Sequence, residues 1–251
     1  IEAGPSDRHF PVNIKATLPI GNIFLLPHSQ YNWQHVFSGG ASVMHRDIPC
    51  PRGRIFGGST SVNGTVYMRG HASDYDEWSA MGNLGWSYNE ILPVFKKHED
   101  YDRGESELHG TGGELCVQRP VESNPLAHAF VEAGVQAGHV RNDDFNGQQQ
   151  DGFGIFDLNQ RNGIRWSSSR AFLHPVMHRP NLVVFEKTLV ERLLLKGQRA
   201  IGIRTRSEGR GFELMADQEV ILCGGAINSP QLLMLSGIGR ASELEAHGIS
   251  V

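Results

Sequence analysis

The amino-acid sequence predicts an α/β protein, and three observations carry this prediction. Helical patterns with recognisable caps occupy the middle of the chain. Runs of alternating apolar and polar residues, typical of strands, follow Pro180. A glycine-rich stretch, GRIFGGSTSVNGTVYMRG at residues 53–70, follows a strand-like beginning. Strands that meet helices at both ends of a chain, with a mixed middle, favour the α/β class.

The first 52 residues are expected to be mostly irregular. Residues 1–4, IEAG, are typical of the end of a strand that begins upstream. No Met starts the sequence, so we expect the chain to be cut at this end. Residues 5–52 are rich in Pro, Gly and Asn and show little periodicity, which predicts long surface loops.

Two helices are predicted after the glycine-rich stretch. Residues 73–81 favour a short helix. Residues 87–101 favour a longer helix, because Ser87 and Glu90 form the S-x-x-E pattern of a capping box. Pro93 is expected to break or kink this second helix early, since proline lacks the backbone N–H that a helix interior uses.

A strand and two further helices are predicted in the middle of the chain. The segment GELCVQ, residues 113–118, is typical of a strand. Residues 124–138 favour a helix, with Asn124 as its cap and Gly138 as its stop. Residues 167–179 favour another helix that begins at a serine cap and has a proline near its end.

The last third of the chain predicts strands and one helix. Residues 181–206 favour a strand followed by a hairpin, with the turn at Lys196–Gln198. Residues 212–225 favour two more strands with a turn near Asp217.

A helix is then predicted over residues 228–237. Ser229 is its expected cap, Pro230 its first residue and Gly237 its stop. Internal repeats and low-complexity segments are absent from the sequence.

Composition excludes several classes of protein. Hydrophobic residues make up 39% of the chain, enough for a folded core, and the net charge of −4 argues against nucleic-acid binding. No apolar run is long enough to span a membrane, and no signal peptide is recognised. The three cysteines form no CxxC pair, which favours a reducing, cytoplasmic location, with peripheral membrane association as the alternative. Motifs for metal binding, for serine hydrolases and for P-loop nucleotide hydrolysis are missing from the sequence.

The glycine-rich stretch has two interpretations from its residues alone. Gly57 and Gly58 precede three hydroxyl residues, 59–61, which are good caps for a helix. A helix start exposes free N–H groups, and glycines let a phosphate approach them closely. A tight turn before an ordinary buried helix explains the glycines equally well.

A second, weaker signal lies at the start of the chain. Glu2 follows a strand-like segment, and an acid at that place in a dinucleotide-binding fold binds the ribose hydroxyls. The G-x-G-x-x-G motif that accompanies such an acid is not present, because the segments at 152–157 and 237–242 both fail its spacing. From the residue alone, an ordinary surface carboxylate is the simpler interpretation.

Together, these segments resemble the glucose–methanol–choline (GMC) family of FAD-dependent oxidoreductases. Two segments look like the two family signatures, GGSTSVNGTVYMRGHASDYDEW at 57–78 and GAINSPQLLMLSGIG at 225–239. Three more match the family in order and spacing, at 82–100, 144–154 and 179–203. The pattern is most similar to bacterial choline or alcohol dehydrogenases.

The resemblance implies an FAD site built from both ends of the chain. Glu2 would hold the adenosine ribose, and Val190 would contact the adenine through its backbone, although a strand-core valine is the simpler interpretation of Val190. The full set of implied cofactor-binding residues is Glu2, Ile55, Gly57, Gly58, Ser59, Asn63, Gly64, Thr65, Val66 and Val190. Of these, Ile55 and the run from Asn63 to Val66 would line the pyrophosphate and the isoalloxazine. Some family members attach the flavin covalently through a His just before that Asn; here Val62 stands there, so we expect non-covalent FAD.

The implied fold is an FAD-binding Rossmann-like domain with an interleaved substrate or cap domain, incomplete in this chain. We expect residues 1–70 and 167–251 to form the FAD-binding part, 71–113 a helical connection and 114–166 the cap part. The parts of the family that carry the G-x-G-x-x-G turn and the catalytic His lie outside the matched segments.

The implied function is oxidation of the CH–OH group of a small alcohol by hydride transfer to flavin N5. We assign no catalytic residue, because none of the twelve histidines matches the family's base; His71, His98 and His174 are expected to be structural or solvent-facing. We therefore expect the 251-residue chain alone to be inactive. Two alternatives stay open, a hydroxynitrile lyase on the same fold and a non-catalytic FAD-binding fragment. The electron acceptor and the identity of the alcohol are left open.

Overall fold

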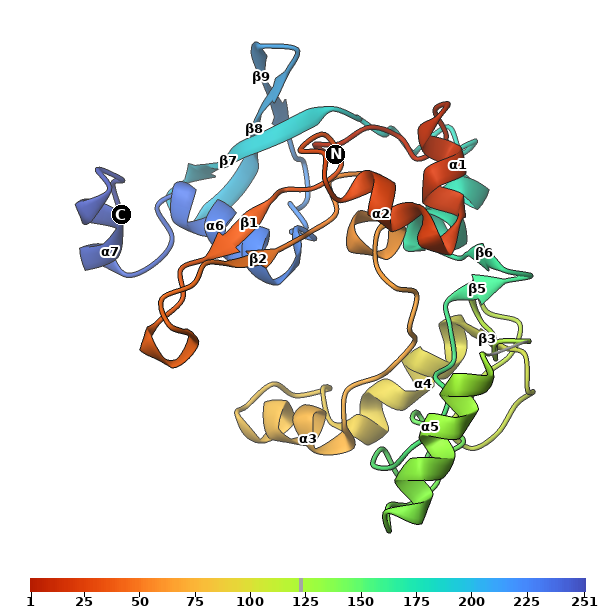
Figure 1. The fold of residues 1–251 in the computed structure, drawn as a ribbon. Helices are drawn as coiled ribbons and strands as arrows, with labels where there is room; N and C mark the ends of the chain where they lie inside the picture. Colours follow the sequence, from red (N-terminus) through yellow and green to blue (C-terminus); the bar gives the residue numbers. More distant parts are fainter. Residues whose placement is uncertain (122–123) are drawn as a thin grey trace. The chain divides into compact units, whose positions relative to one another are not determined.

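A computed structural model describes residues 1–121 and 124–251, which form a mixed α/β structure (Figure 1). The chain divides into two compact units that interleave along the sequence. The first unit contains residues 1–6, 54–56 and 183–251, and the second contains residues 7–53 and 57–182. Each unit has its own secondary structure and is described by itself.

An antiparallel three-stranded sheet forms the centre of the first unit. Its strands β7 (Thr188–Lys196), β8 (Arg199–Ser207) and β9 (Arg210–Met215) lie in the order β7-β8-β9. Leu193 of β7 pairs with Ile203 of β8, which places both on the same face. The predicted strand–turn–strand is confirmed.

The N-terminal residues run beside the start of β7. The backbone N–H of Glu2 donates to the carbonyl of Phe185 at 2.8 Å, and the N–H of Thr188 donates to the carbonyl of Glu2 at 2.9 Å. Residues 1–4 form no assigned strand, and the chain bends at Ala3 and Gly4. A side chain at Gly4 would lie 1.9 Å from the carbonyl oxygen of Arg54, so glycine is required for this close approach.

Helix α6 (Gly225–Leu235) packs beside β7, and α7 (Ala241–Ala246) follows it. The helix begins four residues before Ser229, so the predicted start at Ser229 and Pro230 is wrong. Ser229 Oγ instead accepts a hydrogen bond from the N–H of Gly224, the residue before the helix, which satisfies that donor from inside the first turn. The predicted stop is confirmed, since Gly237 has a φ of 84°.

The second predicted strand within residues 212–225 does not form. No described residue pairs with residues 219–224, and the side chain of Ile221 is 73% exposed. An isolated strand without a hydrogen-bonded neighbour has no stability of its own, and this explains the failure of an otherwise strand-like pattern.

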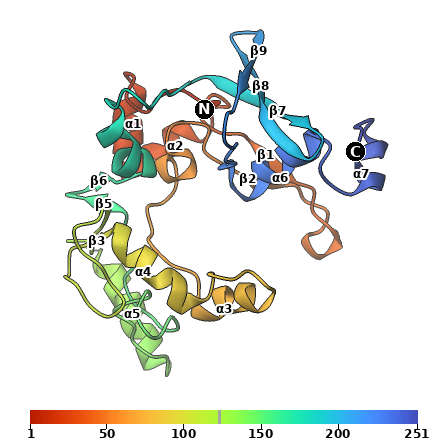
Figure 2. The same cartoon turned by 180° about the vertical axis from the view of Figure 1, so that it is seen from behind.

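The first part of the second unit contains short helices and a hairpin rather than only loops. Helices α1 (Val12–Thr17) and α2 (Asn22–Leu25) flank the 3-10 turn η1 (Pro19–Gly21). Strands β1 (His35–Phe37) and β2 (Ile48–Cys50) form an antiparallel arm, with the turn η2 (Ala41–Val43) at its tip (Figure 2). The prediction that residues 5–52 form only loops is therefore wrong. Elements of three to six residues are too short to produce a periodic pattern in the sequence.

Helices α3 (Ala72–Ala80) and α4 (Tyr88–His98) follow the glycine-rich stretch, as predicted. Both begin with a capping box, and in α4 it is the predicted pair of Ser87 and Glu90. Pro93 does not break α4, which continues to His98. Packing of Phe95 against Tyr75, at 5.8 Å between ring centroids, holds the helix beyond the proline.

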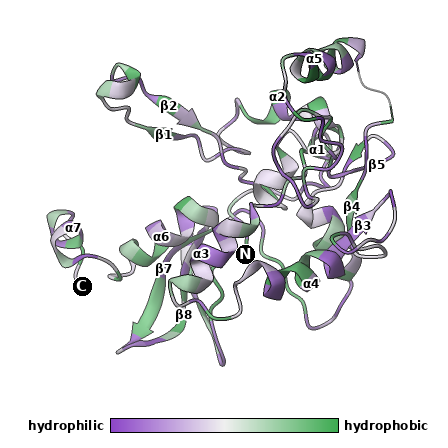
Figure 3. Ribbon diagram, turned by 90° about the horizontal axis from the view of Figure 1, so that it is seen from below, coloured by the Kyte–Doolittle hydropathy of each residue, from purple (hydrophilic) through white to green (hydrophobic). Residues whose placement is uncertain are grey.

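A small parallel sheet and a capped helix form the middle of the second unit. Strand β3 (Glu99–Tyr101) pairs with the predicted strand β4 (Leu115–Val117). Helix α5 (Pro125–Gln136) begins at Asn124, whose Oδ1 accepts the N–H of Leu126. Figure 3 shows green and purple residues alternating around α5. One face is buried, while an apolar residue on another, Phe130, is 67% exposed.

The last part of the second unit begins with strands β5 (Gln160–Arg161) and β6 (Ile164–Arg165). The helix predicted over residues 167–179 is instead a π turn, η4 (Ser169–Leu173), followed by a 3-10 turn, η5 (His174–Val176). Ser167 Oγ accepts the N–H of Arg170, as the predicted serine cap would, whereas the next serine, Ser168, bonds to the glycine-rich stretch.

Candidate cofactor-binding site

The glycine-rich stretch forms a tight turn rather than the start of a regular helix. Residues Gly58–Ser61 make one 3-10 turn, η3, which begins after Gly57 with a φ of 83°. No side chain caps this turn. The hydroxyls that were expected to act as helix caps bond within the loop instead: Ser59 Oγ accepts from the N–H of Gly53, and Thr60 Oγ1 donates to the carbonyl of Gly57.

The glycines of this stretch fall into two classes. Packing requires Gly53 and Gly57, because a Cβ at Gly53 would lie 2.2 Å from the carbonyl oxygen of Gly58, and one at Gly57 would lie 2.5 Å from Ser61 Oγ. A Cβ at Gly58 or Gly64 would meet no protein atom within 4 Å. These two glycines therefore face open space, and the described chain gives Gly64 no steric reason to be glycine.

Thr65 holds a strained backbone conformation beside this open face. Its φ of 65° is uncommon for a β-branched residue, and its side chain is buried. Three contacts fix it: its N–H donates to Asn63 Oδ1, its Oγ1 accepts from Gln160 Nε2 at 2.7 Å, and its carbonyl accepts the N–H of Asn159 at 2.7 Å. Strain that the surroundings over-determine in this way is characteristic of ligand-binding segments.

Three apolar residues lie within or next to the loop in the sequence: Ile55, Val62 and Val66. Ile55 and Val62 are buried, so they serve the packing of their own units. Val66, by contrast, is 46% exposed and its backbone bridges to Leu158. Of these three, Val66 presents apolar surface that a ligand could cover.

The first unit carries the other predicted residues. Glu2 Oε1 accepts the N–H of Gly4 at 2.8 Å. Burial raises the pKa of Glu2 above its ordinary value despite this hydrogen bond. Val190 lies in β7 opposite Thr205 and is half-buried. Glu2, Ile55 and Val190 thus belong to one compact unit, whereas residues 57–66 belong to the other.

The sequence did not point to the segment 158–169, which forms hydrogen bonds with the glycine-rich loop. Ser168 Oγ lies 2.9 Å from Thr60 Oγ1, and Arg165 Nη1 donates to the carbonyl of Thr60 and to Asn63 Oδ1. The one available signal was a charged residue between Ile164 and Trp166 in a strand-like run. That signal indicates a buried arginine but does not name its partners.

Two buried nitrogens beside the loop lack a hydrogen-bond partner among the residues that the structure describes. They are Nδ2 of Asn159 and Nε of Arg165. Buried polar atoms are rarely left unpaired, and those that are deserve a functional explanation. Both residues also hydrogen-bond to residues 60–65 of the loop.

The three histidines that might have served as a base have structural contacts. His71 caps α3 by accepting the N–H of Ser73, and His174 Nε2 lies 2.8 Å from Asp7 Oδ1. The ring of His98 packs edge-on against Phe95 and Phe172. The expectation that these residues are structural fits each of these contacts.

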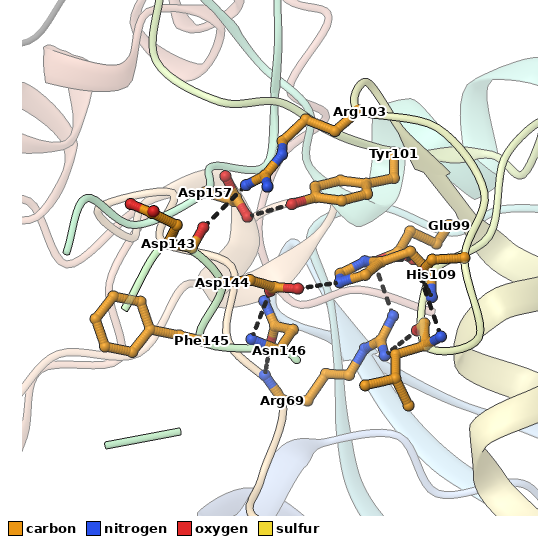
Figure 4. A network of polar contacts seen from close by, with 12 residues as sticks. Arg69, Glu99, Tyr101, Arg103, His109, Asp143, Asp144, Phe145, Asn146 and Asp157 are labelled. Atoms are coloured by element: carbon orange, nitrogen blue, oxygen red, sulfur yellow. Dashed lines mark hydrogen bonds and ion pairs between the residues drawn. The ribbon is translucent and has the colours of Figure 1, made fainter. Parts of the chain in front are cut away.

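A buried ionic network near α4 is a separate feature of the second unit (Figure 4). His109 lies between two carboxylates, with Nδ1 3.2 Å from Glu99 Oε2 and Nε2 3.1 Å from Asp144 Oδ2. Arg69 Nη2 donates to the other oxygen of Glu99 at 2.8 Å. A cavity of about 190 Å³ lies beside Arg69 and Asn146, but their side-chain polar atoms bond to the protein itself. This network is structural.

The described residues offer neither a cluster of His, Cys, Asp and Glu suited to a metal ion nor a helix long and apolar enough to cross a membrane.

The residues of the second unit fit the FAD that the family resemblance implies. Gly58 and Gly64 leave an open face. The amide nitrogen of Asn63 makes no hydrogen bond within the described chain. Arg165, which hydrogen-bonds to the amide oxygen of Asn63, adds a positive charge. Close backbone approach, hydrogen-bond donors and positive charge are what a dinucleotide needs.

Comparison with known proteins identifies the relatives of this chain. The family model described as GMC oxidoreductase matches residues 34–250. Human mitochondrial choline dehydrogenase is 43% identical over the whole chain, which covers 43% of that protein. The oxygen-dependent choline dehydrogenase of Brucella anthropi is 44% identical over 93% of the chain and 42% of that protein. The chain thus spans less than half the length of these relatives.

Solved structures show the same fold. Pyridoxine 4-oxidase from Mesorbium loti superposes with a TM-score of 0.91 and 35% identity, over 99% of this chain and 48% of that one. Formate oxidase from Aspergillus oryzae superposes with a TM-score of 0.86 and 27% identity, over 100% and 44% of the two chains. The latter structure was determined to study modification of its FAD.

Proposed function

Because the chain belongs to the GMC oxidoreductase family, we propose that its protein is an FAD-dependent oxidoreductase acting on the CH–OH group of a small alcohol. One observation supports placing the cofactor at the glycine-rich loop: Gly58 and Gly64 face open space, whereas the other glycines of the loop are needed for packing. The relatives named choline dehydrogenase favour oxidation over the hydroxynitrile lyase alternative and make choline the first substrate to test.

Bound FAD would supply the acceptor for the hydride that leaves the alcohol carbon. The chain's own residues would hold it. Gly58 and Gly64 leave room at the backbone, Asn63 offers the amide nitrogen as a donor, and Val66 offers apolar surface. Glu2 and Val190 in the first unit are proposed for the adenosine end, where the carboxylate of Glu2 would accept hydrogen bonds from the ribose hydroxyls.

We propose that the FAD is non-covalent, because Val62 lacks a nucleophile, and that the protein is cytoplasmic, as its cysteine content favours. We also propose the domain division expected from the resemblance, at 1–70, 71–113, 114–166 and 167–251, with one change. The contacts of Arg165 and Ser168 with the loop support placing the segment 158–169 with the FAD-binding part, which moves one boundary about ten residues earlier.

The test of the function is turnover by the protein encoded by the full reading frame. With FAD and a dye acceptor, choline or a simple primary alcohol should be oxidised above the rate of a blank that contains FAD alone. A flavin-loaded protein that cleaves a cyanohydrin but oxidises none of these alcohols would support the lyase instead. A protein that takes up no FAD would contradict the proposal as a whole.

A further inference from the structure

Arg165 is a buried cation without an acidic partner. Its side chain is 1% exposed, and burial alone lowers its pKa to about 10, so it is charged at neutral pH. Its hydrogen bonds go only to uncharged oxygens: the carbonyls of Thr60 and Pro19 and Oδ1 of Asn63. Arg69, the other deeply buried arginine of this unit, has the carboxylate of Glu99 as its partner.

Burying a charge costs free energy unless an opposite charge or a full set of hydrogen bonds offsets the loss of water. Arg165 has neither, because Nε has no hydrogen-bond partner among the described residues. A bound electron-rich group near Arg165 would offset this cost. The question is which group could lie within its reach.

The contacts of Arg165 lead to the open face of the glycine-rich loop. Nη1 reaches Asn63 Oδ1 at 2.7 Å, and Asn63 immediately precedes Gly64, one of the two glycines that face open space. The pair comes from segments 102 residues apart in the sequence, so the fold brings them together.

Arg165 also fixes which way the amide of Asn63 points. Two groups that can only donate, Arg165 Nη1 and the N–H of Thr65, meet at the same atom of Asn63. That atom must therefore be the oxygen, and Nδ2 lies on the opposite side of the amide. Nδ2 makes no hydrogen bond within the described chain, so it remains a donor for a ligand. Hydrogen bonds in series polarise one another, which strengthens this donor.

We propose that Arg165 is a positioning residue for FAD: it holds Asn63 with Nδ2 directed at an acceptor oxygen of the cofactor and adds the field of its buried charge to that contact. This inference rests on the proposed function. The acceptor is an oxygen of either the pyrophosphate or the flavin ring. Both can accept the hydrogen bond, and the midpoint potential of the flavin distinguishes them.

The first experiment compares Arg165→Met with Arg69→Met in the protein from the full reading frame. Both variants remove a buried guanidinium, so both are expected to lower the melting temperature. Only Arg165→Met should weaken FAD binding, by about 10- to 100-fold in dissociation constant, the range for losing a charge-assisted hydrogen bond. Equal FAD affinity in the two variants would overturn the proposal.

The same Arg165→Met protein, saturated with FAD, distinguishes the two acceptors. A more negative midpoint potential than that of Arg69→Met assigns the contact to the flavin ring, because positive charge near the ring favours its reduced form. An unchanged potential with weaker binding assigns it to the pyrophosphate. Either result supports a positioning role that a purely structural arginine would not have.

A second variant, Asn63→Asp, gives a readout without cofactor. The new carboxylate lies beside Arg165 and provides the missing opposite charge, so the FAD-free protein should melt at a higher temperature than wild type. The same change should lose FAD by at least about 10-fold, because a carboxylate cannot donate. In the Arg165→Met background, Asn63→Asp should lower the melting temperature instead.

The outcomes separate this inference from the proposed function. If wild type takes up no FAD, the function and the inference both fail. If wild type binds FAD and Asn63→Asp is destabilising with Arg165 present, the function stands and only the role of Arg165 is wrong.

Discussion

At the scale of single residues, Val62 bears on how the cofactor is attached. It precedes Asn63, it is 4% exposed, and its side chain has no atom that could form a bond to flavin. Protein unfolding should therefore release the cofactor. We expect acid precipitation of the full-reading-frame protein to leave the yellow colour in the supernatant, measured as absorbance near 450 nm.

A parallel sample with free FAD added to denatured protein controls for trapping in the pellet. Flavin that stays with washed, precipitated wild-type protein would show a covalent bond at a residue other than Val62.

Residue contacts across long sequence distances could not be predicted from the sequence. The site residues implied by the resemblance include Asn63 and Thr65, and the structure places both at the open loop. Their supports, Gln160 and Arg165, were not expected, because no local pattern relates them to residues 95 to 102 positions away. The buried side of a binding loop is set by tertiary contacts, which a single sequence does not display.

At the scale of the element, the glycine-rich loop makes a sharp prediction through Gly64. Gly64→Val should weaken FAD binding at least about 10-fold, since a β-branched side chain would fill the space where we place the cofactor and impair its contacts. The matched control is Gly40→Val, because a Cβ at Gly40 also meets nothing within 4 Å but lies in the hairpin arm. The ratio of absorbance at 450 and 280 nm of the purified variants measures the difference.

Gly58→Val with Gly197→Val repeats the comparison for glycines with positive φ, 54° and 59° respectively. If each loop variant keeps as much FAD as its control, the loop is an ordinary surface turn.

The sequence predicted a helix or strand well where the contacts that stabilise it come from neighbouring residues in the chain. The caps at Ser87 and Asn124 fixed the starts of α4 and α5, because each cap acts within three residues. Residues 167–179 and 219–224 failed for the opposite reason. In the first, the hydroxyl of Ser168 bonds to a loop 111 positions away, and the second has no neighbouring strand among the described residues.

At the scale of the whole molecule, the sequence indicated the α/β class and the family, and the resemblance implied two interleaved parts, but with other boundaries than those of the two compact units. These units interleave, since residues 54–56 join the first unit while the residues on either side join the second. Glu2 and the loop 57–66 were expected at one cofactor and lie in different units.

The buried network around His109 should make the stability of the protein depend on pH. Burial disfavours the charged ring, but hydrogen bonds to Asp144 and Glu99 outweigh it and raise the pKa of His109 to about 9. A group whose pKa is raised by folding stabilises the fold below its unfolded value, about 6.5 for His, and loses that contribution as the pH rises through 9. Burial also opposes ionisation of Glu99, yet hydrogen bonds from His109 and Gly110 keep its pKa below the ordinary value.

We therefore expect the melting temperature to fall between pH 6.5 and 9, with a slope of up to about 1.4 kcal/mol per pH unit in unfolding free energy. On the acid side, Glu99 and Asp144, whose pKa values are both lowered, lose their contribution as the pH falls below about 4, so stability should decline again.

The variant His109→Gln tests this assignment. It should be less stable than wild type at pH 6.5 and should show no decline up to pH 9, because glutamine carries no proton to lose. His247→Gln, at an exposed position after α7, should follow the wild-type curve. A decline in His109→Gln as steep as in wild type would assign the alkaline transition to another group and leave the network without a charged histidine.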